Sequence, residues 1–247
     1  MAVPQPTRSG RTLAQPWRMA AATEVDVALV LAADVSGSVS DARERRQREG
    51  YATGLRSPAF LGAVRSGRLG RIAALYFEWS THDRQIEAMD WTVISDAVSA
   101  EMLARAILAT PRMTPGFTSI SGAIDFAMRR IRQAGFVAAR LVIDVSGDGR
   151  NNDGREVRVA RDAAVAAGVT VNGLPMLEAE PDLDSYYRTE VIGGPLAFAI
   201  PVPTAESIAA AILRKLVTEV AGVNRRMVVH GASGTPDPTE WLIPPSS

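Results

Sequence analysis

The stretch "VDVALVLAADVSGSVS", residues 25–40, combines an apolar run with a polar loop. Residues 25–33 are apolar almost throughout, which favours a central β-strand covered on both faces over a half-exposed strand. Asp34 ends this run, and Ser36 and Ser38 follow it at alternate positions. In open parallel sheets, ligands bind beyond the carboxyl ends of the strands. The stretch therefore predicts a sheet and a candidate binding site at one edge of it.

The rest of the chain alternates short apolar segments with longer segments of helical period, which is typical of βα units around a mainly parallel sheet. A single large α/β domain is expected for this length. The predicted strands cover residues 25–33, 70–80, 139–147, 169–176 and 196–202, with a short antiparallel edge hairpin at 84–91. The predicted helices cover residues 41–66, 92–110, 118–135, 155–167, 182–191 and 204–221.

The composition excludes several classes of function. Lys plus Arg and Asp plus Glu are equal at 27 each, so no basic excess favours a nucleic-acid partner. The chain has no cysteine, which removes disulfides, thiolate zinc sites and cysteine nucleophiles. The longest purely apolar run, residues 27–33, is far shorter than the about 20 residues that a membrane span needs. No membrane insertion is therefore expected.

Both ends of the chain differ from the middle in composition. Residues 1–23 contain arginines and small residues but no apolar segment of the length that a signal peptide has, and they are predicted to be a flexible leader. Residues 223–247 are rich in proline and are predicted to form an irregular tail. The folded domain is expected over residues 24–222.

Three polar clusters are expected to meet at the carboxyl edge of the sheet, if the strands at 25–33 and 139–147 are neighbours. Two clusters end these strands, and the third follows the proline-containing loop at 111–117. Their side chains are Asp34, Ser36, Ser38, Thr118 and Asp148. Two carboxylates and three hydroxyls form an all-oxygen set that suits a hard divalent cation. Mg²⁺ is the natural candidate, with Mn²⁺ or Ca²⁺ as alternatives, and such a site keeps positive charge for an incoming anion.

These clusters resemble a known motif. The segments "DVSGS" (34–38) and "SGDG" (146–149), together with Thr118, are similar to the metal-ion-dependent adhesion site of von Willebrand factor A (vWA) domains. That motif consists of Asp-x-Ser-x-Ser, a Thr and an Asp-Gly. The resemblance covers about residues 24–222 and is strongest to a bacterial group of unknown function. It implies a Rossmann-like three-layer α/β/α fold, with a mainly parallel central sheet and one short antiparallel edge strand.

The resemblance also implies a function. Ser36, Ser38 and Thr118 are expected to bind the metal directly, and the two aspartates partly through water. The metal would accept an Asp or Glu carboxylate from a partner protein, and the helix at 204–221 would move on binding. Relatives in the bacterial group are often exported, whereas the visible N-terminus shows no signal peptide. A periplasmic or exported location and a cytoplasmic one both stay open.

Two other functions stay open at this stage. A Mg²⁺-dependent hydrolase or phosphatase would use an aspartyl nucleophile on a similar sheet. Against it, the residues after Asp34 supply no second acid, and no lysine precedes Lys215. The other alternative is a structural vWA domain without bound metal, and the five filled ligand positions argue against it. Asp34 and Thr118 also have a simpler interpretation as turn or helix caps.

Other polar residues are given structural roles. Asp144 is a rival of Asp148, but it lies inside an apolar strand and is expected to have a buried partner or a shifted pKa. The charged stretch at 41–50 is predicted to be the solvated face of a helix. Residues 151–153 are expected to shape a turn. The two histidines, His82 and His230, are expected to be exposed.

Overall fold

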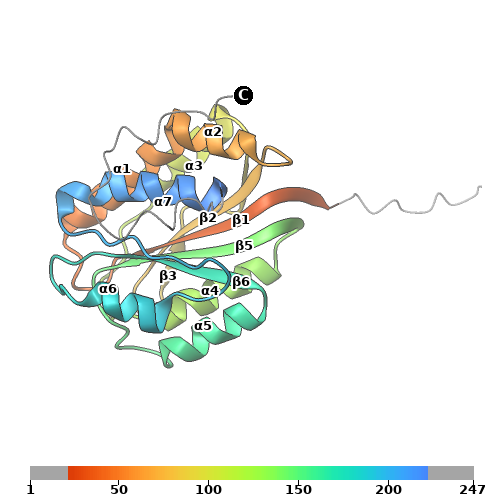
Figure 1. Cartoon of the computed structure of the whole chain (residues 1–247). Coiled ribbons are helices and arrows are strands. Elements are labelled where there is room, and N and C mark those ends of the chain that lie inside the picture. Colours follow the sequence, from red (N-terminus) through yellow and green to blue (C-terminus); the bar gives the residue numbers. More distant parts are fainter. Residues whose placement is uncertain (1–21, 222–247) are drawn as a thin grey trace, which may run out of the picture.

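A six-stranded sheet forms the centre of the molecule, and helices cover both of its faces (Figure 1). The structure is a computed structural model that describes residues 22–221. Its strands run in the order β3-β2-β1-β5-β6, and β4 pairs with β2 beside β3. The parallel strands are β1 (Thr23–Asp34), β2 (Ile72–Trp79), β5 (Phe136–Gly147) and β6 (Val169–Pro175). The antiparallel strands are β3 (Gln85–Glu87) and β4 (Thr92–Ile94). The predicted α/β fold with a mainly parallel sheet is confirmed, with two short antiparallel segments instead of one.

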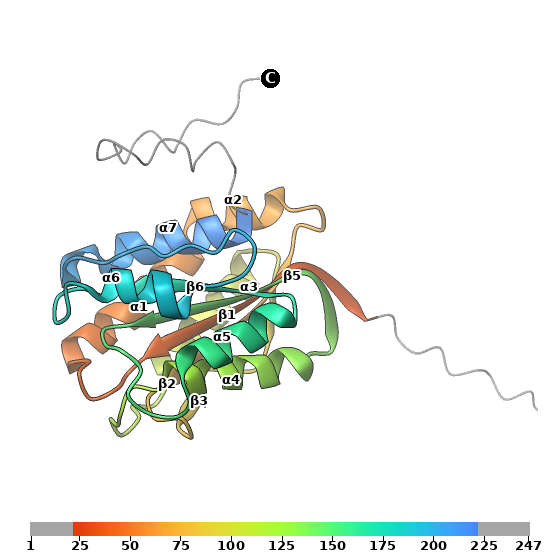
Figure 2. The same ribbon diagram turned by 60° about the horizontal axis from the view of Figure 1, so that its bottom comes forward.

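The helices form one layer on each side of the sheet (Figures 1 and 2). The first layer comprises α1 (Asp41–Arg56), α2 (Pro58–Ser66), α3 (Ala97–Ala109) and α7 (Ile208–Ala221). The second layer comprises α4 (Ile120–Arg132), α5 (Val157–Ala166) and α6 (Leu183–Tyr186), which continues as a π-helical turn over Tyr187–Val191. Alternate residues of β1 enter the two cores, because side chains of a strand point to opposite faces.

The single helix predicted over residues 41–66 is wrong, because two helices occupy this range. Ser57 separates them, and its side chain accepts a hydrogen bond from the Phe60 N–H (3.1 Å). Pro58 has no N–H to donate within a continuing helix, but it fits the first turn of a new one. The break therefore has a local cause in the Ser-Pro dipeptide.

Two further predicted elements differ from the structure. The helix expected over 92–110 begins only at Ala97, because Asp96 and Ser99 form a capping box there and residues 92–94 pair with β2 as β4. The strand expected over 196–202 makes only isolated bridges beside β6, through Ala199 and Val202.

The two strands that carry the predicted site are neighbours, as expected. β1 and β5 pair in parallel, and Ala33 lies beside Ser146 in the register. Asp34 and Asp148 therefore leave the sheet at the same carboxyl edge. The predicted tail and nearly all of the predicted leader lie outside the described residues. Within residues 22–221, no helix is both long and apolar enough to span a membrane.

Candidate metal site

The loop after β1 is held in place by three hydrogen bonds. The Oδ1 atom of Asp34 accepts a hydrogen bond from the Ser36 N–H (2.7 Å), which turns the chain sharply at the strand end. Gln47 of α1 donates its Nε2–H to the Asp34 carbonyl (3.0 Å). The Gly37 N–H donates to the Gly116 carbonyl (2.9 Å), which joins this loop to the segment before Thr118. Two of the three polar clusters thus meet at their backbones.

The side-chain oxygens of the predicted site form a continuous chain of contacts. Thr118 Oγ1 donates to Ser36 Oγ (3.1 Å), and Ser36 Oγ lies 3.3 Å from Ser38 Oγ. Ser38 Oγ in turn donates to Asp148 Oδ1 (2.5 Å). Ser38 is exposed and the other members are buried. The structure therefore brings all five predicted residues together, with Asp34 bonded to the Ser36 backbone.

Asp34 is the most perturbed group of the site. Its side chain is fully buried, and burial, together with the nearby Asp148 carboxylate, raises the pKa of Asp34 to about 7. Its Oδ2 atom has no hydrogen-bond partner among the described residues, and the same is true of the buried Tyr187 hydroxyl. Both atoms border Gly147, since a Cβ placed there would lie 2.9 Å from Asp34 Oδ2 and 2.8 Å from Tyr187 Oη. Two unsatisfied oxygens thus lie next to the cluster.

Thr118 does not cap its helix. Ser119 is the N-cap of α4, and its Oγ accepts a hydrogen bond from the Gly122 N–H (3.2 Å). Asn152 holds the Thr118 backbone from the other side, because its Oδ1 accepts from the Thr118 N–H (2.8 Å). The simpler interpretation of Thr118 as a helix cap is therefore wrong, and its hydroxyl is free to face Ser36.

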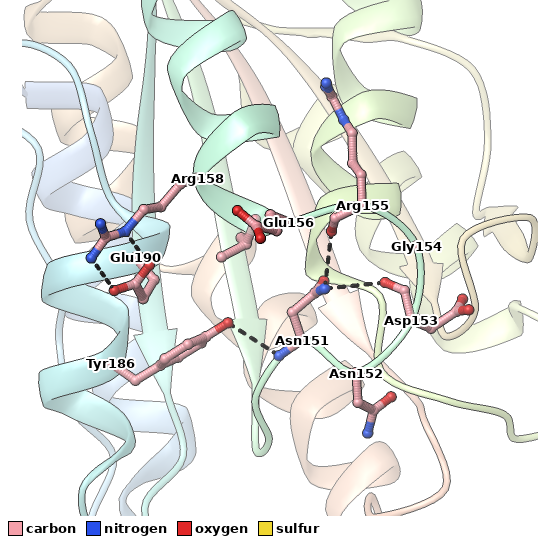
Figure 3. Close-up of a pocket in the computed structure, with 10 residues that line it drawn as sticks. Asn151, Asn152, Asp153, Gly154, Arg155, Glu156, Arg158, Tyr186 and Glu190 are labelled. Atoms are coloured by element: carbon pink, nitrogen blue, oxygen red, sulfur yellow. Dashed lines mark hydrogen bonds and ion pairs between the residues drawn. The ribbon is translucent and has the colours of Figure 1, made fainter.

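The loop that follows Asp148 is itself braced by its neighbours (Figure 3). The Asn151 N–H donates to the Tyr186 hydroxyl (3.2 Å), and the Asn151 side chain donates to the carbonyls of Asp153 (3.1 Å) and Arg155 (3.2 Å). These contacts border a pocket of about 330 Å³ behind the loop. Residues 151–153 connect β5 to α5, but the helix expected from Arg155 begins only at Val157. On the exposed side, the ring of His82 contacts Asp153 (2.9 Å), whereas His230 lies outside the described residues.

The prediction that residues 41–50 form a solvated face is wrong for part of the stretch. The Arg43 guanidinium contacts Asp148 Oδ2 and donates to Glu178 Oε2 (2.7 Å), and its side chain is only 12% exposed. Arg48 makes two 2.6 Å bonds to the buried carboxylate of Glu78. These residues face inward with Gln47. Their spacing along α1 is helical, a signal that is present in the sequence but that also fits an exposed charged face.

Asp144, the rival of Asp148, lies inside β5 and has the buried partner that its position demands. Lys215 Nζ of α7 lies 2.9 Å from Asp144 Oδ1 and 2.6 Å from Glu219 Oε1. Burial raises the pKa of Asp144 to about 7, although Lys215 opposes this shift. Asp144 therefore belongs to a core charge cluster and not to the edge of the sheet.

A second, larger pocket opens in front of the oxygen cluster. It has a volume of about 690 Å³ and is lined by side chains of Ser38, Phe117, Thr118, Asp148 and Glu180, among others. Phe117 is 66% exposed at its rim. The cluster is therefore open to a ligand from solvent.

The sequence places this chain in a protein family. Residues 24–224 match the model of a family described as "Protein of unknown function (DUF1194)". The chain belongs to the DUF1194 family. No curated protein sequence is detectably similar to this DUF1194 protein.

Solved structures show the fold of the DUF1194 chain to be that of a vWA domain. The vWF domain of the type V pili tip protein Mfa5 from Porphyromonas gingivalis is 12% identical with a TM-score of 0.56, over 81% of this chain and 97% of that one. Mussel proximal thread matrix protein 1 is 12% identical with a TM-score of 0.57, over 81% of this chain and 48% of that one. A von Willebrand factor type A protein from Catenulispora acidiphila is 12% identical with a TM-score of 0.55, over 80% of this chain and 43% of that one.

The DUF1194 chain thus matches less than half of the mussel and Catenulispora chains. A further structure of the mussel protein is described as having a zinc-occupied MIDAS motif, that is, an occupied metal-ion-dependent adhesion site. It is 14% identical with a TM-score of 0.52, over 82% of this chain and 50% of that one.

The residues of the site fit a divalent cation. Among residues 22–221, no three His, Cys, Asp or Glu side chains are grouped to hold a metal. The oxygens that the predicted site brings together belong to two carboxylates and three hydroxyls. An unpartnered buried carboxylate oxygen costs free energy, and Asp34 Oδ2 is such an atom. A cation beside Asp34 and Asp148 would offset both this cost and the repulsion that raises the pKa of Asp34.

Proposed function

We propose that this DUF1194 protein is a protein-binding module that depends on a divalent metal ion. The observation that carries the proposal is the continuous oxygen cluster from Thr118 through Ser36 and Ser38 to Asp148, with the unpaired Asp34 Oδ2 beside it. Such a set of hard oxygen donors suits Mg²⁺, with Mn²⁺ or Ca²⁺ as alternatives.

The roles of the residues follow from their positions. Ser36, Ser38 and Thr118 would supply direct hydroxyl ligands, and Asp34 and Asp148 would hold the ion partly through water. When bound, the metal supplies a positive centre for an Asp or Glu carboxylate of a partner protein. Neutral hydroxyl ligands do not cancel its charge, so the site keeps an attraction for an anion. The partner carboxylate would enter through the 690 Å³ pocket, whose rim includes Phe117.

The comparisons support this proposal at the level of the fold. The mussel protein has a vWA fold and a structure with a zinc-occupied site, and the Mfa5 domain belongs to a pilus tip protein. The oxygen cluster of this chain lies at the sheet edge where parallel α/β sheets bind ligands. Metal use and the carboxylate-supplying partner are proposed on these grounds.

Calorimetric titration of the chelator-treated full chain with Mg²⁺ and Mn²⁺ tests the proposal. Losing a residue that only supports a ligand typically weakens metal affinity about tenfold. Thr118→Ala removes a proposed direct ligand, so it should weaken metal binding by more than that. Thr114→Ala is a matched control, because Thr114 is exposed in the same loop. Equal affinity in wild type and Thr118→Ala contradicts the assignment. Turnover of an aryl phosphate that disappears in Asp34→Ala would instead favour the hydrolase.

A further inference from the structure

Arg43 places a permanent positive charge on one of the proposed metal ligands. Its guanidinium contacts Asp148 Oδ2, and its Nη2–H donates to Glu178 Oε2 (2.7 Å). The side chain of Asp148 is fully buried, that of Arg43 is 12% exposed, and that of Glu178 is 53% exposed. Arg43 therefore bridges the inside of the site and the solvent.

The carboxylate of Asp148 is used on both oxygens. Its Oδ1 accepts from Ser38 Oγ (2.5 Å), and its Oδ2 accepts from Arg43. A metal ion held by Asp148 would share this carboxylate with the guanidinium. Two positive charges on one carboxylate repel each other, and burial reduces the screening of that repulsion. Arginine stays charged at every pH of interest, so it cannot relieve the repulsion by losing a proton.

Glu178 offers the guanidinium a second partner. The two contacts of Arg43 use different nitrogens, Nη1 for Asp148 and Nη2 for Glu178, so one contact can be lost while the other is kept. Arg150, which also lines the pocket, is paired with Glu180 and Asp182. Within the described part of the chain, Arg43 is thus the arginine that contacts Asp148.

We propose that Arg43 is a positioning residue that sets the metal affinity of the site: it competes with the ion for Asp148, and Glu178 draws its guanidinium away. This inference rests on the proposed function. Arg43 would then limit the metal affinity, because the ion must displace the guanidinium from Asp148 before both carboxylate oxygens can interact with the metal.

Titration of the full chain with Mg²⁺ and Mn²⁺ tests this role through changes of opposite sign. Arg43→Gln removes the competing charge and should tighten metal binding at least about fivefold. Glu178→Gln leaves the guanidinium with Asp148 alone and should weaken binding about twofold or more. Arg45→Gln is the matched control, since Arg45 is an exposed arginine on the same helix, and it should leave the affinity unchanged.

The double variant separates a role through Arg43 from a direct effect of the Glu178 charge. If Glu178 acts through Arg43, Glu178→Gln should have almost no effect when Arg43→Gln is already present. An equal loss in both backgrounds would overturn this part of the proposal. Circular dichroism spectra are the check that each variant is folded. Should Arg43→Gln not fold, Arg43→Met also removes the competing charge and should bind metal more tightly than wild type.

The outcomes separate this inference from the proposed function. Metal binding by wild type with the same or lower affinity in Arg43→Gln, or in Arg43→Met where Arg43→Gln does not fold, overturns the role of Arg43 and leaves the metal site standing. Absence of binding in every variant overturns both. Tighter binding in Arg43→Gln, with Arg45→Gln unchanged, supports both.

Discussion

Asp34 and Asp148 leave the neighbouring strands β1 and β5 at the same edge of the sheet, and the Asp148 carboxylate adds to the effect of burial in raising the pKa of Asp34 to about 7. Asp148 is held by Ser38 and Arg43, whereas Asp34 Oδ2 has no hydrogen-bond partner among residues 22–221. The two carboxylates thus differ in environment although they belong to one cluster. This asymmetry makes the protonation of Asp34 sensitive to pH.

The stability of the protein in chelator should depend on pH through Asp34. Its pKa is about 7 in the folded chain against an ordinary value of 3.8, so the folded state holds the proton more tightly. The stability linked to this proton is fully present below pH 3.8 and is lost as the pH rises through 7. The shift corresponds to about 4 kcal/mol. Asp34→Asn has no proton to lose in this range, so its free energy of unfolding in urea should fall less between pH 4.5 and 8 than that of wild type. Parallel dependence of the two unfolding free energies on pH would contradict the prediction.

Gly147 should tolerate no side chain. A Cβ at this position would lie 2.8 Å from Tyr187 Oη and 2.9 Å from Asp34 Oδ2, both in buried surroundings. Gly147→Ala should lower the free energy of unfolding by about 1–3 kcal/mol, the range for overpacked cores. Gly149→Ala is the comparison, because its Cβ would lie 3.7 Å from Thr118 Oγ1, an ordinary contact. Equal unfolding midpoints for the two variants would argue against tight packing at Gly147.

Asn152 should influence metal binding without being a ligand. Its side chain accepts from the Thr118 N–H (2.8 Å) and so fixes the backbone that carries the Thr118 hydroxyl. Asn152→Ala should weaken Mg²⁺ binding about tenfold, as losses outside the first ligand sphere do. Gln133→Ala, which removes an exposed amide at the end of α4, is the control for titration calorimetry. An Asn152→Ala affinity equal to that of the control would show that the brace is dispensable.

Lys215 should be essential for the stability of the layer that contains α7. It pairs with Asp144 (2.9 Å) and Glu219 (2.6 Å), and all three side chains are buried. Lys215→Met leaves two buried carboxylates without their cation and should cost about 3–5 kcal/mol at pH 8. Arg214→Met changes the exposed neighbour and should be nearly neutral. Denaturant unfolding of both variants checks this, and a difference below about 1 kcal/mol would refute it.

The sequence predicts the parts of the fold and of the site that short sequence motifs mark. The apolar run before Asp34 indicates a central strand, and the order of the polar clusters indicates that Thr118 and Asp148 meet it at one edge. Pro58 is also a readable local signal, although the helical period around it suggested one helix. Strand β4 is harder to predict, because its three residues fit a helical pattern as well and only pairing with β2 selects the extended form.

The remaining residues of the site depend on tertiary packing. Arg43 and Gln47 lie on a helix whose charged residues fit an exposed face equally well, and only the docking of α1 on the sheet turns them inward. Tyr187 approaches Gly147 from a π-helical turn about forty residues further along the chain, and no motif marks it. These residues are placed by tertiary packing, whereas the oxygen cluster is what the motif predicts.

Anomalous diffraction from crystals of the full chain soaked with Mn²⁺ tests the central claim most directly. The proposed function predicts an anomalous peak at the carboxyl edge of the sheet, about 2–2.6 Å from the hydroxyl oxygens of Ser36, Ser38 and Thr118. A saturating soak that leaves this cluster without a peak, or that places the ion on other residues, would contradict the account.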